Sequence, residues 1–219
     1  MKKQLLGLIL LLMLFTSYTP NFNFNTDSNL NIKKIKIENN YILSSDEIEK
    51  KLDFLLSENL FLMNIDEIHR SLKELDFIDS FSVKKIYPNT IKINVIEKKP
   101  IAILQNKKKK YYISDRGDII IFKKIKLFKS LPIVFGGETK FYSFYKDILS
   151  INFPINNVEK FYFFESGRWD IILRNKKVVK LPINNYLPSL KNFLLSQGNT
   201  NFDKYKIFDY RIKEQLILN

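Results

Sequence analysis

The sequence predicts an α+β protein in three parts: an N-terminal transmembrane helix, a small module with the element order β-α-α-β-β, and a C-terminal mixed α/β domain dominated by an antiparallel sheet. Three observations support this prediction. One long uncharged segment lies near the start of the chain, two segments with helical apolar spacing follow, and the second half contains more alternating segments than helical ones. The expected boundaries are residues 1–25, 30–100 and 101–219.

The N-terminal segment is a membrane signal. Lys2 and Lys3 precede the apolar run Leu5–Phe15, and no charged residue occurs from Gln4 to Thr26. A spanning helix needs about 20 apolar residues, and a shorter run is also typical of a cleaved signal peptide. The segment after the run lacks Ala and Gly at a cleavage-like position, which favours a retained anchor. Either alternative exports everything after about residue 25, with the lysines on the cytoplasmic side.

The first module begins with a half-buried strand in which Ile35 and Ile37 alternate with lysines. Ser44, with Glu47 three positions later, predicts the start of a helix, and Asn64 predicts the start of a second one. Two alternating strands follow, residues 81–84 and 91–95, joined by a turn at residues 87–90. The residues expected to face the helices are Val83, Ile91, Ile93 and Val95. This order and size resemble a POTRA domain, a non-catalytic fold that offers sheet edges and helix grooves to other proteins.

The second module is predicted to contain two core helices, residues 139–150 and 185–196. A three-strand meander is expected over residues 158–164, 169–173 and 177–181, and a final strand over Tyr210–Leu218. Trp169, the single tryptophan, is favoured as a core residue over a binding residue. The lysine run at residues 107–110 is expected to be a solvated loop rather than a nucleic-acid patch.

Composition excludes several functions. The 219 residues contain no cysteine, which rules out a disulfide framework, a cysteine-ligated zinc site and a cysteine nucleophile. The net charge of +13 is compatible with nucleic acid or an anionic membrane, but lysines scattered along the predicted elements favour a compositional bias. The single histidine, His69, is expected to be exposed on a helix. Without a nucleophile elbow, a phosphate loop or clustered acids, no enzyme, cofactor or metal site is predicted.

Six segments resemble the signature of the FtsQ/DivIB family of cell-division proteins, as found in alphaproteobacteria. The first runs through the last hairpin of the POTRA-like module into Glu97-Lys98-Lys99-Pro100, where the family often has Arg in place of Lys98. The fourth contains Arg168-Trp169-Asp170 and lacks the family's second Arg, because Gly167 stands there. The six segments occur in family order at residues 83–102, 112–120, 131–136, 165–175, 179–182 and 209–212.

The resemblance implies a non-enzymatic divisome scaffold of the bacterial inner membrane. Such a protein would be single-pass and type II, with a cytoplasmic N-terminus and a periplasmic bulk, and it would act at the division septum. Its implied partners are FtsB and FtsL, bound through the last strands of the β-domain, with the FtsW/FtsI-type synthesis machinery as a further partner. The alternatives are a POTRA-containing chaperone or outer-membrane assembly module, and a periplasmic enzyme.

We place the partner site on the predicted last strand, because no following segment covers its outer edge and no proline or bulge blunts it. The alternative is a central strand that closes the sheet. Arg211 is expected to make a bidentate contact with a partner carboxylate, because the docking segment of FtsB is acidic in the family. The predicted partner-binding residues are Arg168, Tyr210, Arg211, Ile212, Lys213, Gln215, Leu216, Ile217 and Leu218.

Overall fold

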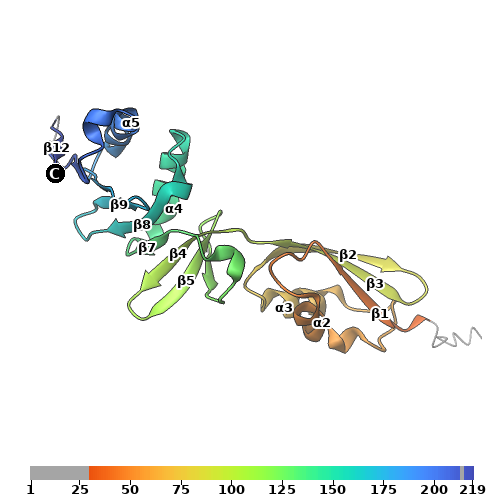
Figure 1. Ribbon diagram of the computed structural model, residues 1–219. Coiled ribbons are helices and arrows are strands. Elements are labelled where there is room, and N and C mark those ends of the chain that lie inside the picture. The colour runs from red at the N-terminus through yellow and green to blue at the C-terminus, as the bar shows by residue number, and fades with distance from the viewer. Residues whose placement is uncertain (1–29, 213–214) are drawn as a thin grey trace, which may run out of the picture.

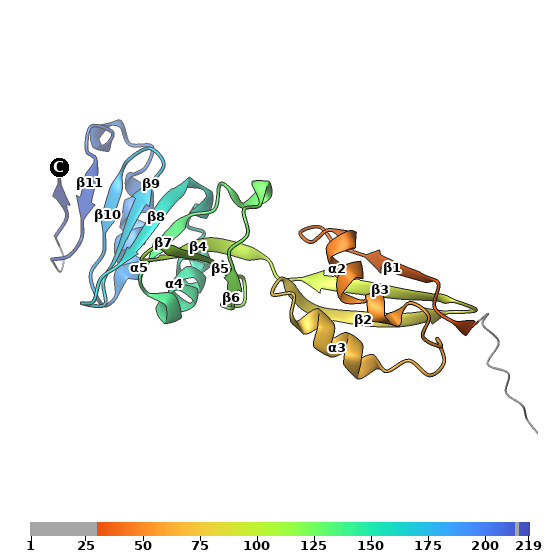
Figure 2. The same ribbon diagram turned by 90° about the horizontal axis from the view of Figure 1, so that it is seen from below.

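The structure, a computed structural model, describes residues 30–212 and 215–219. Two sheets lie end to end along an elongated molecule, with residue 30 at one extremity and the last strand at the other (Figures 1 and 2). No helix in these described ranges is long and apolar enough to span a membrane. The predicted anchor, residues 1–25, lies outside the described residues, and so does Lys213.

The first sheet has three strands in the order β1-β3-β2. The strands are β1 (Lys34–Glu38), β2 (Ile78–Ile86) and β3 (Thr90–Glu97), with β1 parallel and β2 antiparallel to β3. Two helices, α2 (Ser45–Lys51) and α3 (Ile65–Lys73), cover one face, with the 3-10 turn η2 (Asp53–Leu55) between them. The predicted β-α-α-β-β order is therefore confirmed.

Side-chain periodicity explains this packing. Ile91, Ile93 and Val95 alternate along β3 and are at most 1% exposed, and they share one core with Ile48 of α2 and Ile68 of α3. Val83 packs against the same core, so the four residues predicted to face the helices do so. His69 is exposed on α3, as expected.

Both helix starts follow the predicted capping residues. The Ser44 hydroxyl accepts a hydrogen bond from the Glu47 amide at 3.2 Å, and the Asn64 side chain accepts one from the Asp66 amide at 2.9 Å. The carboxylate of Glu47 accepts a hydrogen bond from Lys123 of the second module at 2.6 Å, so it links the two modules.

The second sheet has nine strands among the described residues, in the order β12-β11-β10-β9-β8-β7-β4-β5-β6. Five strand contacts are antiparallel, but β4/β7, β7/β8 and β10/β11 are parallel, so the sheet is more mixed than the prediction. The strand bounds are β4 Pro100–Asn106, β5 Lys109–Ser114, β6 Ile119–Ile121, β7 Ile133–Phe135, β8 Val158–Phe163, β9 Trp169–Leu173, β10 Val178–Lys180, β11 Ile207–Asp209 and β12 Ile217–Leu218.

Helices α4 (Glu138–Ser150) and α5 (Tyr186–Ser196) lie on the same face of this sheet (Figure 2). The core between these helices and the sheet is rich in aromatic side chains. Trp169 is 4% exposed and stacks on Phe144 of α4 at 4.6 Å, which confirms its core role. Three 3-10 turns complete the module, η3 (Lys126–Phe128), η4 (Ile155–Asn157) and η5 (Thr200–Phe202).

The two modules share buried residues where β3 continues into β4. Tyr112 of β5 is 1% exposed, belongs to the core of the first module and contacts Phe77 with ring centroids 5.9 Å apart. Its hydroxyl donates to the Lys123 carbonyl at 2.7 Å. At the surface, Arg116 contacts Asp79 of β2 at 2.6 Å. A continuous apolar contact therefore joins the modules.

Of the described residues in the predicted strand Tyr210–Leu218, only Ile217 and Leu218 form a strand, so this prediction is wrong for the others that the structure describes. A strand ends earlier, at Asp209, and its side chain accepts a hydrogen bond from the Arg211 amide at 3.1 Å. Such a local side-chain contact bends the backbone out of an extended path. The Gln215 amide bonds to the Ile212 carbonyl, and Ile217–Leu218 pair with β11 as the short antiparallel strand β12.

Candidate partner-binding edge

Strand β12 forms the C-terminal edge of the nine-stranded sheet. Asn219 and Ile207 exchange both main-chain hydrogen bonds, at 3.1 and 2.8 Å. In an antiparallel pair, bonded and non-bonded positions alternate, so the main-chain N–H and C=O of Leu218 point outward from the sheet. Within residues 30–212 and 215–219 no strand pairs with that side. The edge can accept an additional strand.

Side chains of β12 separate by face. Leu216 and Leu218 pack against the core of the second module, whereas Ile217 is 42% exposed. The alternation expected over this end of the chain therefore holds for these three residues. Ile212, which has the parity of Leu216, is 51% exposed, because it lies in the turn and not in a strand.

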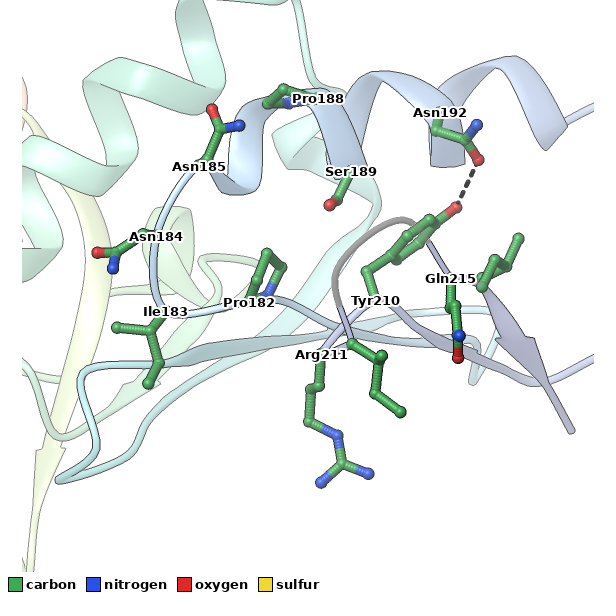
Figure 3. Close-up of a pocket in the computed structure, with 12 residues that line it drawn as sticks. Pro182, Ile183, Asn184, Asn185, Pro188, Ser189, Asn192, Tyr210, Arg211 and Gln215 are labelled. Carbon is green, nitrogen blue, oxygen red and sulfur yellow. Dashed lines mark hydrogen bonds between the residues drawn. The ribbon is translucent and has the colours of Figure 1, made fainter.

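An open pocket of about 760 Å³ lies beside this edge (Figure 3). It is formed by the connection from β10 to α5, the start of α5 and the turn after β11. Five of the predicted partner-binding residues line it together with residues that were not predicted. The lining residues are Pro182, Ile183, Asn184, Asn185, Pro188, Ser189, Asn192, Tyr210, Arg211, Ile212, Gln215 and Leu216.

Tyr210 is a structural element of this pocket. It is 7% exposed, its amide donates to the Lys180 carbonyl at 2.9 Å, and its hydroxyl donates to Asn192 of α5 at 3.0 Å (Figure 3). Burial raises the pKa of Tyr210 to about 12, so the phenol stays neutral. Tyr210 therefore fixes the turn against α5, and its exposed area is too small for a large contact with a partner.

A row of charged residues crosses the sheet next to the pocket. The strand register places Lys180 of β10 between Asp170 of β9 and Asp209 of β11. Arg168 donates to Asp170 at 3.1 Å, and Arg211 donates to Asp209 through Nε and Nη2, the latter at 2.6 Å. We call these five residues the charged row. Its basic side chains outnumber its acidic ones.

The two carboxylates of the charged row lie in different environments. Burial raises the pKa of Asp170 above its ordinary value, although Arg168 opposes this effect. The hydrogen bonds from Arg211 lower the pKa of Asp209 below its ordinary value. The Arg168 guanidinium also lies over the Phe164 ring, 4.1 Å from its centroid. Both arginines are therefore held in place by their own chain.

The structure thus brings most of the predicted site residues to one edge. Arg168 lies farther in, at the start of β9, and joins the others through the charged row. The residues missed at the sequence level are Asp170, Lys180, Asp209 and Asn192. Arg168 with Asp170, and Asp209 with Arg211, are opposite charges two positions apart, which on a strand share a face. That spacing is a signal that could have identified them.

Comparison with known proteins indicates the family. The family model described as "POTRA domain, FtsQ-type" matches residues 30–98. The cell division protein FtsQ of Rickettsia bellii is 28% identical over 89% of this chain and 74% of its own length. FtsQ of Rickettsia felis is 27% identical over 98% of this chain and 87% of its own, and FtsQ of Rhizobium meliloti 29% over 69% and 50%. The chain is thus similar, over most of its length, to cell division proteins of the FtsQ/DivIB family.

Similarity to these FtsQ proteins indicates a role in cell division, and it agrees with the prediction of a non-enzymatic protein. It also favours division over the outer-membrane assembly alternative. The extracytoplasmic domain of DivIB from Geobacillus stearothermophilus matches 45% of this chain and 89% of its own at 9% identity, with a TM-score of 0.34. That structural similarity is too low to bear on the fold.

Proposed function

We propose that the protein is a single-pass scaffold of the inner membrane that acts at the division septum and binds the FtsB–FtsL pair through its periplasmic β-domain. Residues 1–25 anchor it with the N-terminus in the cytoplasm, residues 30–100 form the POTRA domain, and residues 101–219 form the β-domain. One observation carries the proposal: the outward main-chain groups of Leu218 lie on an open sheet edge beside the pocket and the charged row.

Binding occurs by strand addition. A partner strand beside β12 satisfies the N–H and C=O groups of Leu218 and extends the sheet by one strand. Main-chain hydrogen bonds of this kind supply affinity with little sequence specificity. Specificity then comes from the side chains around the edge, chiefly the exposed Ile217 and the pocket against α5.

The charged row selects an acidic partner. Arg168, Lys180 and Arg211 face two carboxylates, so one positive charge remains uncompensated. The Arg211 side chain is 46% exposed and is held by Asp209. A positioned arginine binds a carboxylate at a lower entropic cost than a free one. An acidic segment beside the added strand fits this arrangement.

The FtsW/FtsI-type synthesis machinery is a further partner that the family resemblance implies. Nucleic acid, cofactors and small-molecule substrates have no part in this function. The protein acts by positioning its partners, which assemble where its exposed sheet edge lies.

A proline at Leu218 tests the strand addition directly. Leu218→Pro removes the outward N–H, while Leu218→Ala truncates the side chain and keeps that N–H. In a pull-down from membranes with the full-length protein, Leu218→Pro should lose most of the captured FtsB–FtsL pair and Leu218→Ala should keep more of it. Equal capture by both variants at the wild-type level would place the partner elsewhere.

Two further experiments test the location. A reporter that is active only in the periplasm, fused after Asn219, should be active, and the protein should stay with membranes after a carbonate wash. A fluorescent fusion should gather at mid-cell in dividing cells. A shorter chain released into the soluble fraction would indicate a cleaved signal instead.

A further inference from the structure

The end of the first sheet nearest residue 30 carries a cluster of exposed apolar side chains. Phe61 and Leu62 are 68% and 70% exposed, Tyr87 is 58% exposed and Ile86 is 39% exposed. Scattered exposed apolar residues are normal on a protein surface, but several of them gathered at one end of a molecule mark an interaction surface. We call these four residues the apolar tip.

Hydrogen bonds place two separate segments of the chain in this tip. The Leu60 amide bonds to the Leu30 carbonyl at 2.9 Å, which fixes the loop between α2 and α3 beside the first described residue. The Lys33 amide bonds to the Asn89 carbonyl at 2.9 Å, which fixes the β2–β3 turn there as well. Both loops lie at the extremity of the molecule where the described chain begins (Figures 1 and 2).

The segment 60–63, in the loop between α2 and α3, has two apolar residues in the core and two on the surface. Leu60 and Met63 are 0% and 7% exposed and belong to the core of the first module. Phe61 and Leu62, between them, are exposed. The loop therefore already has the core contacts that fold it, and Phe61 and Leu62 are left for a contact outside the module.

Lysines surround the apolar tip. Lys85 donates to the Phe61 carbonyl at 3.0 Å, and its ammonium lies 6.0 Å from the Phe61 ring centroid. Lys33 and Lys34 are exposed beside the β2–β3 turn. Glu58 and Asp66 lie in and next to the same loop and offset part of this charge. Aromatic and aliphatic side chains with lysines around them are typical of segments that bind at a lipid–water interface.

We propose that the apolar tip inserts into the headgroup region of the bilayer that anchors the chain, with the lysines against anionic phospholipid. The inference rests on the proposed N-terminal anchor. With that anchor ending at residue 25, Leu30 lies five residues further on and at most about 18 Å away when the chain between them is fully extended. Leu30 and the tip bonded beside it therefore stay close to the membrane surface. The POTRA domain is then held by a second contact in addition to its covalent linker.

The absence of cysteine makes this measurable in the full-length protein. The Leu62→Cys variant is labelled at its single cysteine with an environment-sensitive fluorophore. The labelled protein is then reconstituted into vesicles of phosphatidylethanolamine and phosphatidylglycerol. The matched control is Tyr41→Cys, which is 84% exposed in the same module and follows the other end of β1. A second control is Leu195→Cys on α5, which is 83% exposed. The label at position 62 should emit at shorter wavelength and be quenched by nitroxide-bearing lipid, unlike the labels at 41 and 195.

The outcomes separate this inference from the proposed anchor. Equal emission at positions 62 and 41 in membrane-retained protein would overturn it. A shift at position 62 that nitroxide lipid does not quench would also overturn it, because a protein contact would then cover the tip. If a carbonate wash releases the protein, the anchor is wrong. The same label, with the same vesicles added to the released protein, then decides whether the tip binds lipid.

Discussion

The guanidinium of Arg211 is fastened to the carboxylate of Asp209, the residue that ends strand β11. Nε lies 2.8 and 2.9 Å from the two carboxylate oxygens, and Nη2 lies 2.6 Å from Oδ2. The bidentate contact expected with a partner is thus already formed within the chain. Under the proposed function, Arg211 would contact a partner from a fixed position and through the remaining part of its guanidinium.

Reversing this charge should weaken partner capture. Arg211→Glu places two carboxylates side by side at the binding edge, and we expect capture of the FtsB–FtsL pair to fall by about tenfold or more. Lys129→Glu, an exposed change outside the charged row, makes the same change in net charge and should leave capture unaltered. Pull-downs at matched salt concentration provide the measurement. If the two variants bind alike, the charged row does not contact the partner.

The same pair makes stability depend on pH. The pKa of Asp209 is lowered in the folded protein, so its contribution is present above the ordinary Asp value of 3.8 and is lost as the pH falls through the lower folded value. Asp209→Asn should reduce the free energy of unfolding at pH 7, and the difference from wild type should shrink below about pH 4.

The fluorescence of Trp169, buried in the same module, follows this unfolding. Glu165→Gln, at an exposed carboxylate of the same module that forms no ion pair among the described residues, is the control and should change stability little at either pH. A constant difference between wild type and Asp209→Asn from pH 7 to pH 3 would show that the ion pair does not stabilise the fold.

Two isoleucines on one strand test the register of the first sheet. Ile93 is 0% exposed and faces the helices, whereas Ile96 is 58% exposed on the opposite face. Ile93→Asp buries a carboxyl group in an apolar core and should cost at least about 3 kcal/mol. Ile96→Asp should change stability by less than about 1 kcal/mol. Circular dichroism melts of the two purified variants make the comparison, and similar melting temperatures would contradict the register.

Alanine substitutions at two glycines compare the cost of a steric clash with the cost of a strained backbone. Gly137 has φ +63°, and a Cβ there would lie 2.7 Å from the Trp169 ring and 2.8 Å from Phe163. Gly198 has φ +87° with open space around it. Gly137→Ala should cost about 2–4 kcal/mol, and Gly198→Ala about 1 kcal/mol for the left-handed backbone alone. Thermal unfolding followed by Trp169 fluorescence measures both. Equal losses would mean that the ring moves aside freely.

Local pattern was sufficient to predict the elements of the first module, because each element there has one apolar face with a clear period. Helix α5 shows the limit of that method. Leu195 of this predicted core helix is 83% exposed, whereas Phe193 is 1% exposed. Apolar residues surround most of this helix, so its rotation about its own axis is set by the sheet it covers and not by its sequence.

Long-range pairing was beyond local pattern. The parallel contacts of β7 with β4 and β8 join segments that are separated in the sequence by other helices or strands. Strand β7 has only three residues, and their sequence does not indicate which strands pair with it. The charged row has the same origin, since Asp170, Lys180 and Asp209 meet only through strand register. The last strand is shorter than the alternation in Arg211–Leu218 predicts, because the contact between the Asp209 side chain and the Arg211 amide bends the chain after β11.

The buried contact of Tyr112 with Phe77 has a mechanical consequence. Since the two modules share a continuous apolar core, we expect the molecule to behave as one rigid strut and not as two modules joined by a flexible linker. Residue 30 lies at one extremity and β12 at the other (Figure 1). A strut of fixed length sets the height at which its far end is presented. With the proposed anchor at one end and the proposed binding edge at the other, partners whose docking segments lie nearer to the membrane, or farther from it, are excluded by reach alone, whatever their sequence.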